Sequence, residues 1–95
     1  MRNERYRQER EEIKELLLQY ENLRAGRANS FIEQEGFERL VEYYDEKDRF
    51  DDAITVCDYA INQYPNTAAL LLLKANLLIV TKKYKEALEL LNKSE

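Results

Sequence analysis

The sequence predicts an all-α protein, an α-solenoid of antiparallel helical hairpins, and three observations support this fold class. The 95 residues are rich in Glu, Lys, Leu, Arg and Ala and include two Gly and one Pro, the composition of a helical chain. Apolar residues recur three and four positions apart, the period of one helix face, and no strand pattern is present. Finally, an apolar pattern recurs along the chain at the fixed interval that separates Phe50 from Tyr84, which predicts stacked two-helix units.

This spacing predicts about five helices. Gly26 follows the first at the place of a left-handed C-cap. The sequence SFIE then has the pattern of a capping box, with Ser30 as the N-cap and Glu33 reaching back. Asp48 is expected to cap the third helix, and Pro65 interrupts the chain before the fourth. The short connections predict antiparallel neighbours. The expected helices span residues 3–24, 31–47, 50–63, 67–80 and 84–93.

The repeat becomes visible when the chain is compared with itself in the register that places Phe50 on Tyr84. RFDDAITVC and KYKEALELL then place side chains of similar size and character at most of the same positions. A small residue, Ala53 or Ala87, lies where the two helices of a hairpin cross closely. The larger side chains beside it are expected to fill the wider space and the next layer of the core. The aligned pairs are Phe50 with Tyr84, Ala53 with Ala87, Ile54 with Leu88, and Cys57 with Leu91.

Two sets of residues carry a family resemblance. They are Leu40, Val41, Tyr44, Phe50, Ala53, Cys57, Ala60 and Pro65 in one unit, and Leu71, Ala75, Leu78, Tyr84, Ala87 and Leu91 in the next. This pattern resembles the tetratricopeptide repeat (TPR), whose helix–turn–helix unit recurs at the same interval. Phe37 and Val41 depart from it, since the family often has Trp and a small residue there. The resemblance implies a right-handed superhelix whose first helices line a concave groove, and a function in protein–protein interaction.

On this basis the chain divides into three parts of one domain: an N-terminal capping helix (1–29), TPR-like repeat 1 (30–65) and TPR-like repeat 2 (66–95). The sequence leaves open whether the last repeat is complete. In the register of the repeat, Leu16, Tyr20 and Leu23 align with large or packing residues of the third helix, whereas Gln19 aligns with an alanine. We therefore interpret the first helix as the degenerate second helix of a missing repeat. The alternative is a short coiled-coil or dimer helix that also uses Tyr6.

A candidate partner-binding groove follows from the resemblance. Four acidic residues spaced three, four and three apart form one stripe on the second helix: Glu35, Glu38, Glu42 and Asp45. In the resembling family these positions point into the concave groove. The second repeat has Ala69, Leu72, Asn76 and Ile79 at the same positions. The implied groove is acidic at one end and apolar at the other, and it favours a segment with Lys or Arg followed by apolar residues. The alternative for the acidic stripe is a solvated face.

The sequence offers no catalytic chemistry. It has no His, one Cys and no spaced Asp loop, so we expect no metal site, no cofactor and no enzyme activity. Cys57 lies at a packing position. The charge of −7 over residues 31–64 disfavours nucleic acid as a partner. The charged start lacks a Sec-type signal peptide and the apolar runs are short, so we expect a cytoplasmic protein and no membrane partner.

The sequence therefore predicts a non-catalytic interaction scaffold or adaptor that presents a concave groove to a protein or peptide. Two alternatives remain. One is a homo-oligomerisation module, because Leu88, Leu90 and Leu91 stand near the end of the chain, where repeat arrays normally have a polar face. The other is an N-terminal regulatory segment of a longer TPR protein.

Overall fold

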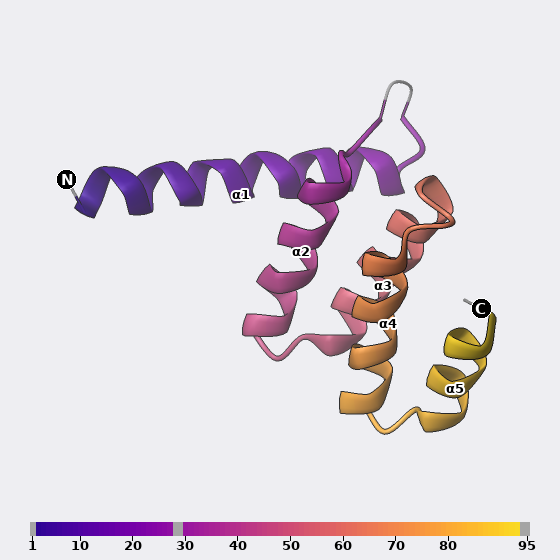
Figure 1. Ribbon diagram of the computed structural model, residues 1–95. Coiled ribbons are helices and arrows are strands. Elements are labelled where there is room, and N and C mark those ends of the chain that lie inside the picture. Colours follow the sequence, from indigo (N-terminus) through magenta and orange to yellow (C-terminus); the bar gives the residue numbers. More distant parts are fainter. Residues whose placement is uncertain (1, 28–29, 94–95) are drawn as a thin grey trace.

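The computed structural model describes residues 2–27 and 30–93, with side chains from residue 7 onward, and these residues form five helices and no strand (Figure 1). α2 and α3 form one hairpin and α4 and α5 a second, and α3 packs against α4, so the hairpins stack in chain order. The predicted all-α fold of stacked hairpins is confirmed. The side chain of Tyr6 lies outside the described residues. The helices are α1 (Arg2–Arg24), α2 (Gln34–Glu46), α3 (Phe50–Gln63), α4 (Ala68–Val80) and α5 (Tyr84–Lys93).

The turns of the two hairpins share one backbone conformation. Asp48 after α2 and Lys82 after α4 both have a left-handed backbone, with φ of 57° and 64°. A left-handed residue just past a helix turns the chain so that amides reach the last free carbonyls. The prediction that Asp48 caps α3 is therefore wrong: it ends α2, and Arg49 is the N-cap residue. The matching bonds are Arg49 N–H to Tyr44 O (2.9 Å), Asp48 N–H to Asp45 O (3.0 Å), Lys83 N–H to Leu78 O (2.7 Å) and Lys82 N–H to Ile79 O (3.0 Å).

The predicted capping box before α2 is also wrong. The Ser30 hydroxyl donates backwards to the Arg27 carbonyl at 2.6 Å. α2 begins one residue after Glu33, with no side-chain cap bond. The reason is Ile32, which is buried and whose carbonyl accepts two hydrogen bonds from the end of the first hairpin. These contacts hold residues 30–33 outside the helix. The two donors are Gln63 Nε2 (2.6 Å) and the Tyr64 hydroxyl (3.1 Å).

The alanines of the repeat are buried, as the sequence predicts. Ala53 is 0% exposed and Ala87 is 3% exposed. Because a methyl group takes little room, the two helices of each hairpin can approach closely at these positions. Around Ala53 a continuous core forms from α2, α3 and α4, and α1 adds Tyr20 to it. Its buried members include Phe37, Leu40, Val41, Val56, Cys57, Ala60, Leu70 and Leu77.

The second hairpin is less covered than the sequence predicts. Cys57 on α3 is completely buried, but its counterpart Leu91 is 37% exposed. Tyr84, expected to fill space beside Ala87, is 59% exposed. These two predictions are wrong for a simple reason. α4 lies against α3, where Lys74 forms an ion pair with Asp58 at 2.6 Å, whereas the described residues contain no helix that follows α5.

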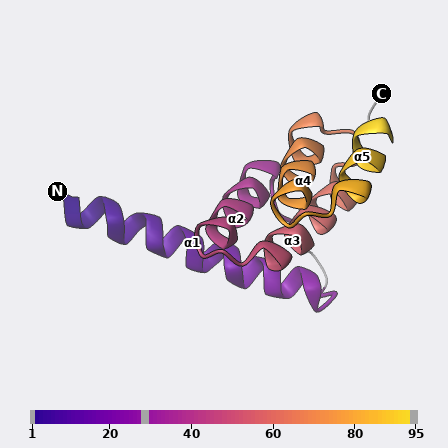
Figure 2. The ribbon, with the colours of Figure 1, turned by 90° about the horizontal axis from the view of Figure 1, so that it is seen from below.

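α1 crosses the first hairpin and does not run alongside it (Figures 1 and 2). Its C-terminal part packs on α2, while its N-terminal part projects away from the hairpins. Tyr20 is 3% exposed and meets the Tyr59 ring edge to face at a centroid distance of 5.7 Å. Gly36 marks a close approach, because a Cβ there would lie 2.9 Å from side-chain atoms of Ile32 and Leu16. Gly26, with φ of 70°, ends α1 as predicted.

Candidate functional site

Two adjoining hollows lie in the angle between α1 and α2, where α1 begins to project away from the hairpins. The larger has a volume of about 1050 Å³ and the smaller of about 450 Å³. Because they share the side chains of Glu12 and Arg39, we treat them as one surface, the α1–α2 cleft. The larger hollow is lined by Arg7, Glu9, Arg10, Glu12 and Ile13 of α1 and by Arg39, Glu42, Tyr43, Glu46 and Lys47 of α2. The smaller is lined by Glu12, Glu15, Leu16, Gln19, Phe31, Glu33, Glu35, Gly36 and Arg39.

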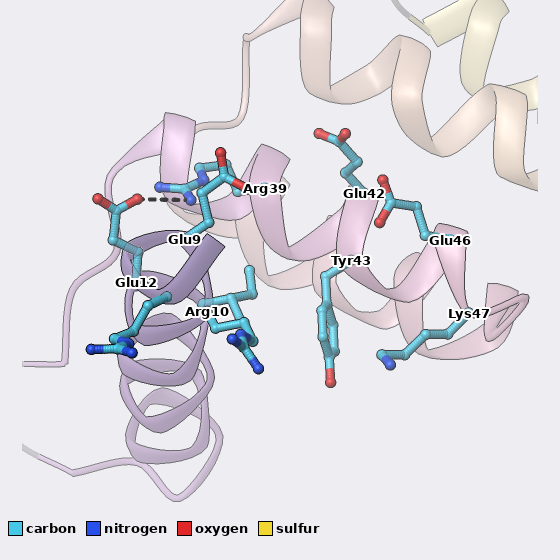
Figure 3. Close-up of a pocket in the computed structure, with 10 residues that line it drawn as sticks. Glu9, Arg10, Glu12, Arg39, Glu42, Tyr43, Glu46 and Lys47 are labelled. Atoms are coloured by element: carbon cyan, nitrogen blue, oxygen red, sulfur yellow. Dashed lines mark ion pairs between the residues drawn. The ribbon is translucent and has the colours of Figure 1, made fainter. Parts of the chain in front are cut away.

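An ion pair bridges the cleft. Arg39 Nη2 lies 3.0 Å from Glu12 Oε2, and this contact links α2 to α1 (Figure 3). Both side chains are more than a third exposed, so water screens the attraction and the pair contributes little to stability, about 0 to 1 kcal/mol. A weak pair of this kind can open without disturbing the fold. Either partner is then available to a charged group from outside.

Aromatic and acidic groups meet in the larger hollow. The Lys47 ammonium lies 5.0 Å from the centroid of the Tyr43 ring, within the range of a cation–π contact. Glu42 and Glu46 extend from another side of the same helix (Figure 3). The Tyr43 face attracts a cation, and the two carboxylates do the same. The hollow as a whole has no net charge, however, because its four carboxylates are matched by four cationic side chains, and Lys47 already lies over the Tyr43 ring.

The smaller hollow, by contrast, carries an excess of negative charge. Four carboxylates line it, those of Glu12, Glu15, Glu33 and Glu35, against the single guanidinium of Arg39. Phe31, at 61% exposure, adds an apolar wall, and its ring also meets the Tyr64 ring. The combination of excess negative charge and an exposed ring fits a basic side chain with an apolar stem or neighbour.

The structure brings only part of the predicted groove to this cleft. On α2, Glu35 lines the smaller hollow and Glu42 the larger, while Glu38 is half-buried and Asp45 is exposed. The four predicted residues of α4 line neither hollow. All four are nevertheless exposed on that helix, Leu72 at 54% and Ile79 at 45%. These α4 residues are Ala69, Leu72, Asn76 and Ile79.

Sequence reasoning missed the α1 wall of the cleft. Arg7, Arg10 and Ile13 face α2 only because α1 crosses it obliquely, and residue spacing carries no information on a crossing angle between separate helices. Arg39 was missed for a different reason. It stands within the acidic stripe of α2, with carboxylates on either side, and an isolated cation there was a signal of a partner such as Glu12.

The single cysteine is not a reactive group. Burial, and to a smaller degree the charge of Asp58, raises the pKa of the Cys57 thiol to about 12. The nucleophilic thiolate is therefore strongly disfavoured near neutral pH. Within residues 2–27 and 30–93 no cluster of His, Cys, Asp or Glu could hold a metal ion. No helix in this part of the chain is both long and apolar enough to cross a bilayer.

A family model, described as tetratricopeptide repeat, matches residues 46–94. This is just over half of the chain and covers α3, both helices of the second hairpin and the turns between them. The chain belongs to the tetratricopeptide repeat family, and the resemblance seen in its sequence is confirmed. No curated protein and no solved structure matches it. Repeats of this family generally mediate protein–protein interaction, and they are typically non-catalytic modules.

Proposed function

We propose that the chain is a non-catalytic scaffold or adaptor that binds a protein segment with basic residues followed by apolar ones. The observation that carries this proposal is the contrast between two equivalent helix faces. On α2 the face holds Glu35, Glu38, Glu42 and Asp45, and on α4 the same positions hold exposed uncharged residues, with Leu72 in place of Glu38 and Ile79 in place of Asp45. A groove along both faces attracts positive charge at one end and apolar side chains at the other.

The α1–α2 cleft extends the acidic end of this proposed groove. Glu35 and Glu42 belong to both surfaces, and Tyr43 supplies an aromatic face next to them. A basic residue of the partner competes with Arg39 for Glu12, and this exchange replaces one ion pair by another. The proposal thus assigns charge recognition to α2 and the neighbouring part of α1.

We also propose that residues 1–29 cap the array, ahead of repeats at 30–65 and 66–95. The burial of Tyr20 and the close approach at Gly36 support this division, because α1 covers apolar surface of the first hairpin. A cytoplasmic setting is part of the proposal.

The test uses two labelled peptides of about twelve residues, which is long enough to follow the groove when extended. One has Lys and Arg followed by Leu and Ile, and the other has Glu and Asp in place of the basic residues. Fluorescence anisotropy should show binding of the basic peptide, weakened by salt because charges are involved. The double variant Glu38→Lys with Glu42→Lys should bind it at least about tenfold more weakly.

The matched control reverses the same number of charges elsewhere. Glu11→Lys with Glu21→Lys changes two exposed residues of α1 that line neither hollow, and it should retain nearly all the affinity. A second variant, Leu72→Glu, should weaken the apolar end of the same interaction. Equal binding of both peptides, or an unchanged affinity of the Glu38 and Glu42 variant, would rule out recognition by this groove.

A further inference from the structure

A second surface lies at the opposite end of the molecule, on α5. Tyr84, Leu88 and Leu91 follow one another at intervals of four and three residues, so they form one stripe on the helix, the α5 stripe. Their exposures are 59%, 61% and 37%. Single exposed apolar residues are ordinary, but three large ones in a row mark an interaction surface.

The equivalent stripe on α3 shows what such a surface accepts. Phe50 and Ile54 pack against the core, and Cys57 is completely buried. α4 lies on this side of α3, since its Lys74 both pairs with Asp58 and affects the charge environment of Cys57. α4 therefore covers the Cys57 end of the α3 stripe. The α5 stripe has the same spacing and apolar side chains of equal or larger size, which makes it suited to receive a helix as well.

We propose that the α5 stripe binds the α5 stripe of a second copy of this chain, in an antiparallel pair about a two-fold axis. A symmetric pair requires a surface that complements itself. The α5 stripe meets this requirement because it contains no charged residue, so no like charges are buried on pairing. The acidic face of α2 does not meet it, because its carboxylates would face those of the second copy.

The charges beside the stripe favour the antiparallel arrangement. Lys85 and Glu89 are exposed, lie one helical turn apart and follow the same flank of α5. When Tyr84 of one copy faces Leu91 of the other, Leu88 lies near the axis. Lys85 is then almost level with Glu89 of the second copy, and symmetry forms this contact twice. A parallel two-fold pair would instead bring opposite flanks of the two helices together, so Lys85 and Glu89 would not meet.

The expected dimer is weak and reversible. α5 has ten residues, so it buries less than the roughly 800 Å² per partner of a standard stable interface. We expect a dissociation constant on the order of 10 to 100 µM. The surface involves α5 and leaves the acidic face of α2 accessible, so this proposal goes beyond the proposed function and can fail independently of it.

Sedimentation velocity of the full chain, from about 5 to about 500 µM, tests the proposal. The wild type should shift from monomer to dimer across this range and go no further, because a two-fold pair is closed. Leu88→Glu should weaken the dimer at least about tenfold, since it places two carboxylates beside the axis. The control is Leu18→Glu, at an equally exposed leucine of α1, which should dimerise like the wild type. Circular dichroism should show unchanged helix content in both variants.

A charge exchange tests the orientation of the two helices. Lys85→Glu and Glu89→Lys should each weaken the dimer, because each places like charges next to one another, and the double variant should recover it. A wild type that stays monomeric, a Leu88→Glu variant that dimerises normally, or assemblies larger than a dimer would each overturn the proposal. Single charge variants that both dimerise like the wild type would overturn the antiparallel arrangement.

Discussion

The two hairpins follow one sequence pattern and have different surroundings. In the first, Ala53 and Cys57 are completely buried and Phe50 packs against the core. In the second, Ala87 is buried, but Leu91 and Tyr84 are substantially exposed. The alanine is buried in both because its own hairpin covers it. The other positions depend on a neighbouring helix, which α3 has in α4.

This contrast separates two kinds of interaction in the repeat. Contacts within a hairpin come from the local pattern and are present in both units, as the matching turns at Asp48 and Lys82 also show. Contacts between hairpins come from position in the stack. The free energy of unfolding that is lost when a residue is replaced should therefore depend more on whether a neighbouring hairpin covers that residue than on its position in the repeat pattern.

The largest expected difference in stability is between two variants that place an aspartate at equivalent positions of the two hairpins, one buried and one exposed. Cys57→Asp buries a carboxylate without a partner and should lower the free energy of unfolding by about 3 to 5 kcal/mol, enough to unfold much of the chain. Leu91→Asp should cost less than about 1 kcal/mol, because the new carboxylate reaches water. Urea denaturation of both variants measures the difference. Similar losses at the two sites would contradict the distinction between the hairpins.

A loss of stability at alkaline pH should come from the core that the first hairpin forms with α1. Burial raises the pKa of Cys57 from 9.0 to about 12 and that of Tyr20 from 10.0 to about 12. Both groups are neutral in the fold, whereas the unfolded chain ionises at the ordinary values. Stability should therefore be constant below pH 9.0 with respect to Cys57 and fall as the pH rises toward 12, by about 4 kcal/mol for this residue.

The variant Cys57→Ala isolates the contribution of the thiol. Its stability should decline later than that of the wild type, starting where Tyr20 begins to ionise in the unfolded chain, near pH 10.0. Denaturation midpoints at several alkaline pH values provide the comparison. Parallel pH profiles of the wild type and the variant would show that the thiol is not the source of the decline.

The smallest effect should come from the turns. Lys82 has a left-handed backbone that strains an ordinary side chain, so Lys82→Gly should stabilise the chain by about 0.5 to 1 kcal/mol. Asp48→Gly should help less, because Asp tolerates this conformation better than Lys does. Thermal denaturation records both changes. Lys82→Ala serves as the control, and a gain as large as that of glycine would point to the lost charge and not to the backbone.

The sequence predicted the features that depend on local spacing. Five helices, the hairpins, the buried alanines and the left-handed Gly26 all follow from residue type and interval. The capping box at Ser30 failed because the burial of Ile32 and the bonds to its carbonyl outweigh a local cap. The exposure of Tyr84 could not be predicted, since a repeat pattern is the same whether or not a neighbour is present.

The candidate site was likewise predicted only where it depends on spacing within one helix. The acidic residues Glu35 and Glu42 were found from their interval along one helix, and both line the α1–α2 cleft. The opposite wall, with Arg7 and Arg10, depends on how α1 crosses α2, and this angle results from packing around Gly36 and Tyr20. Tertiary packing of this kind is not encoded in the spacing of any single segment.

Residue-resolved hydrogen exchange on the intact chain, at concentrations of a few micromolar where it is monomeric, tests the link between stacking and stability. The amides of α3 should exchange slowest, and those of α5 should exchange at least about a hundredfold faster, although the two helices follow the same sequence pattern. Equal protection of α3 and α5 would contradict the link between stacking and stability, because protection would then depend on the pattern within each hairpin and not on a neighbouring helix.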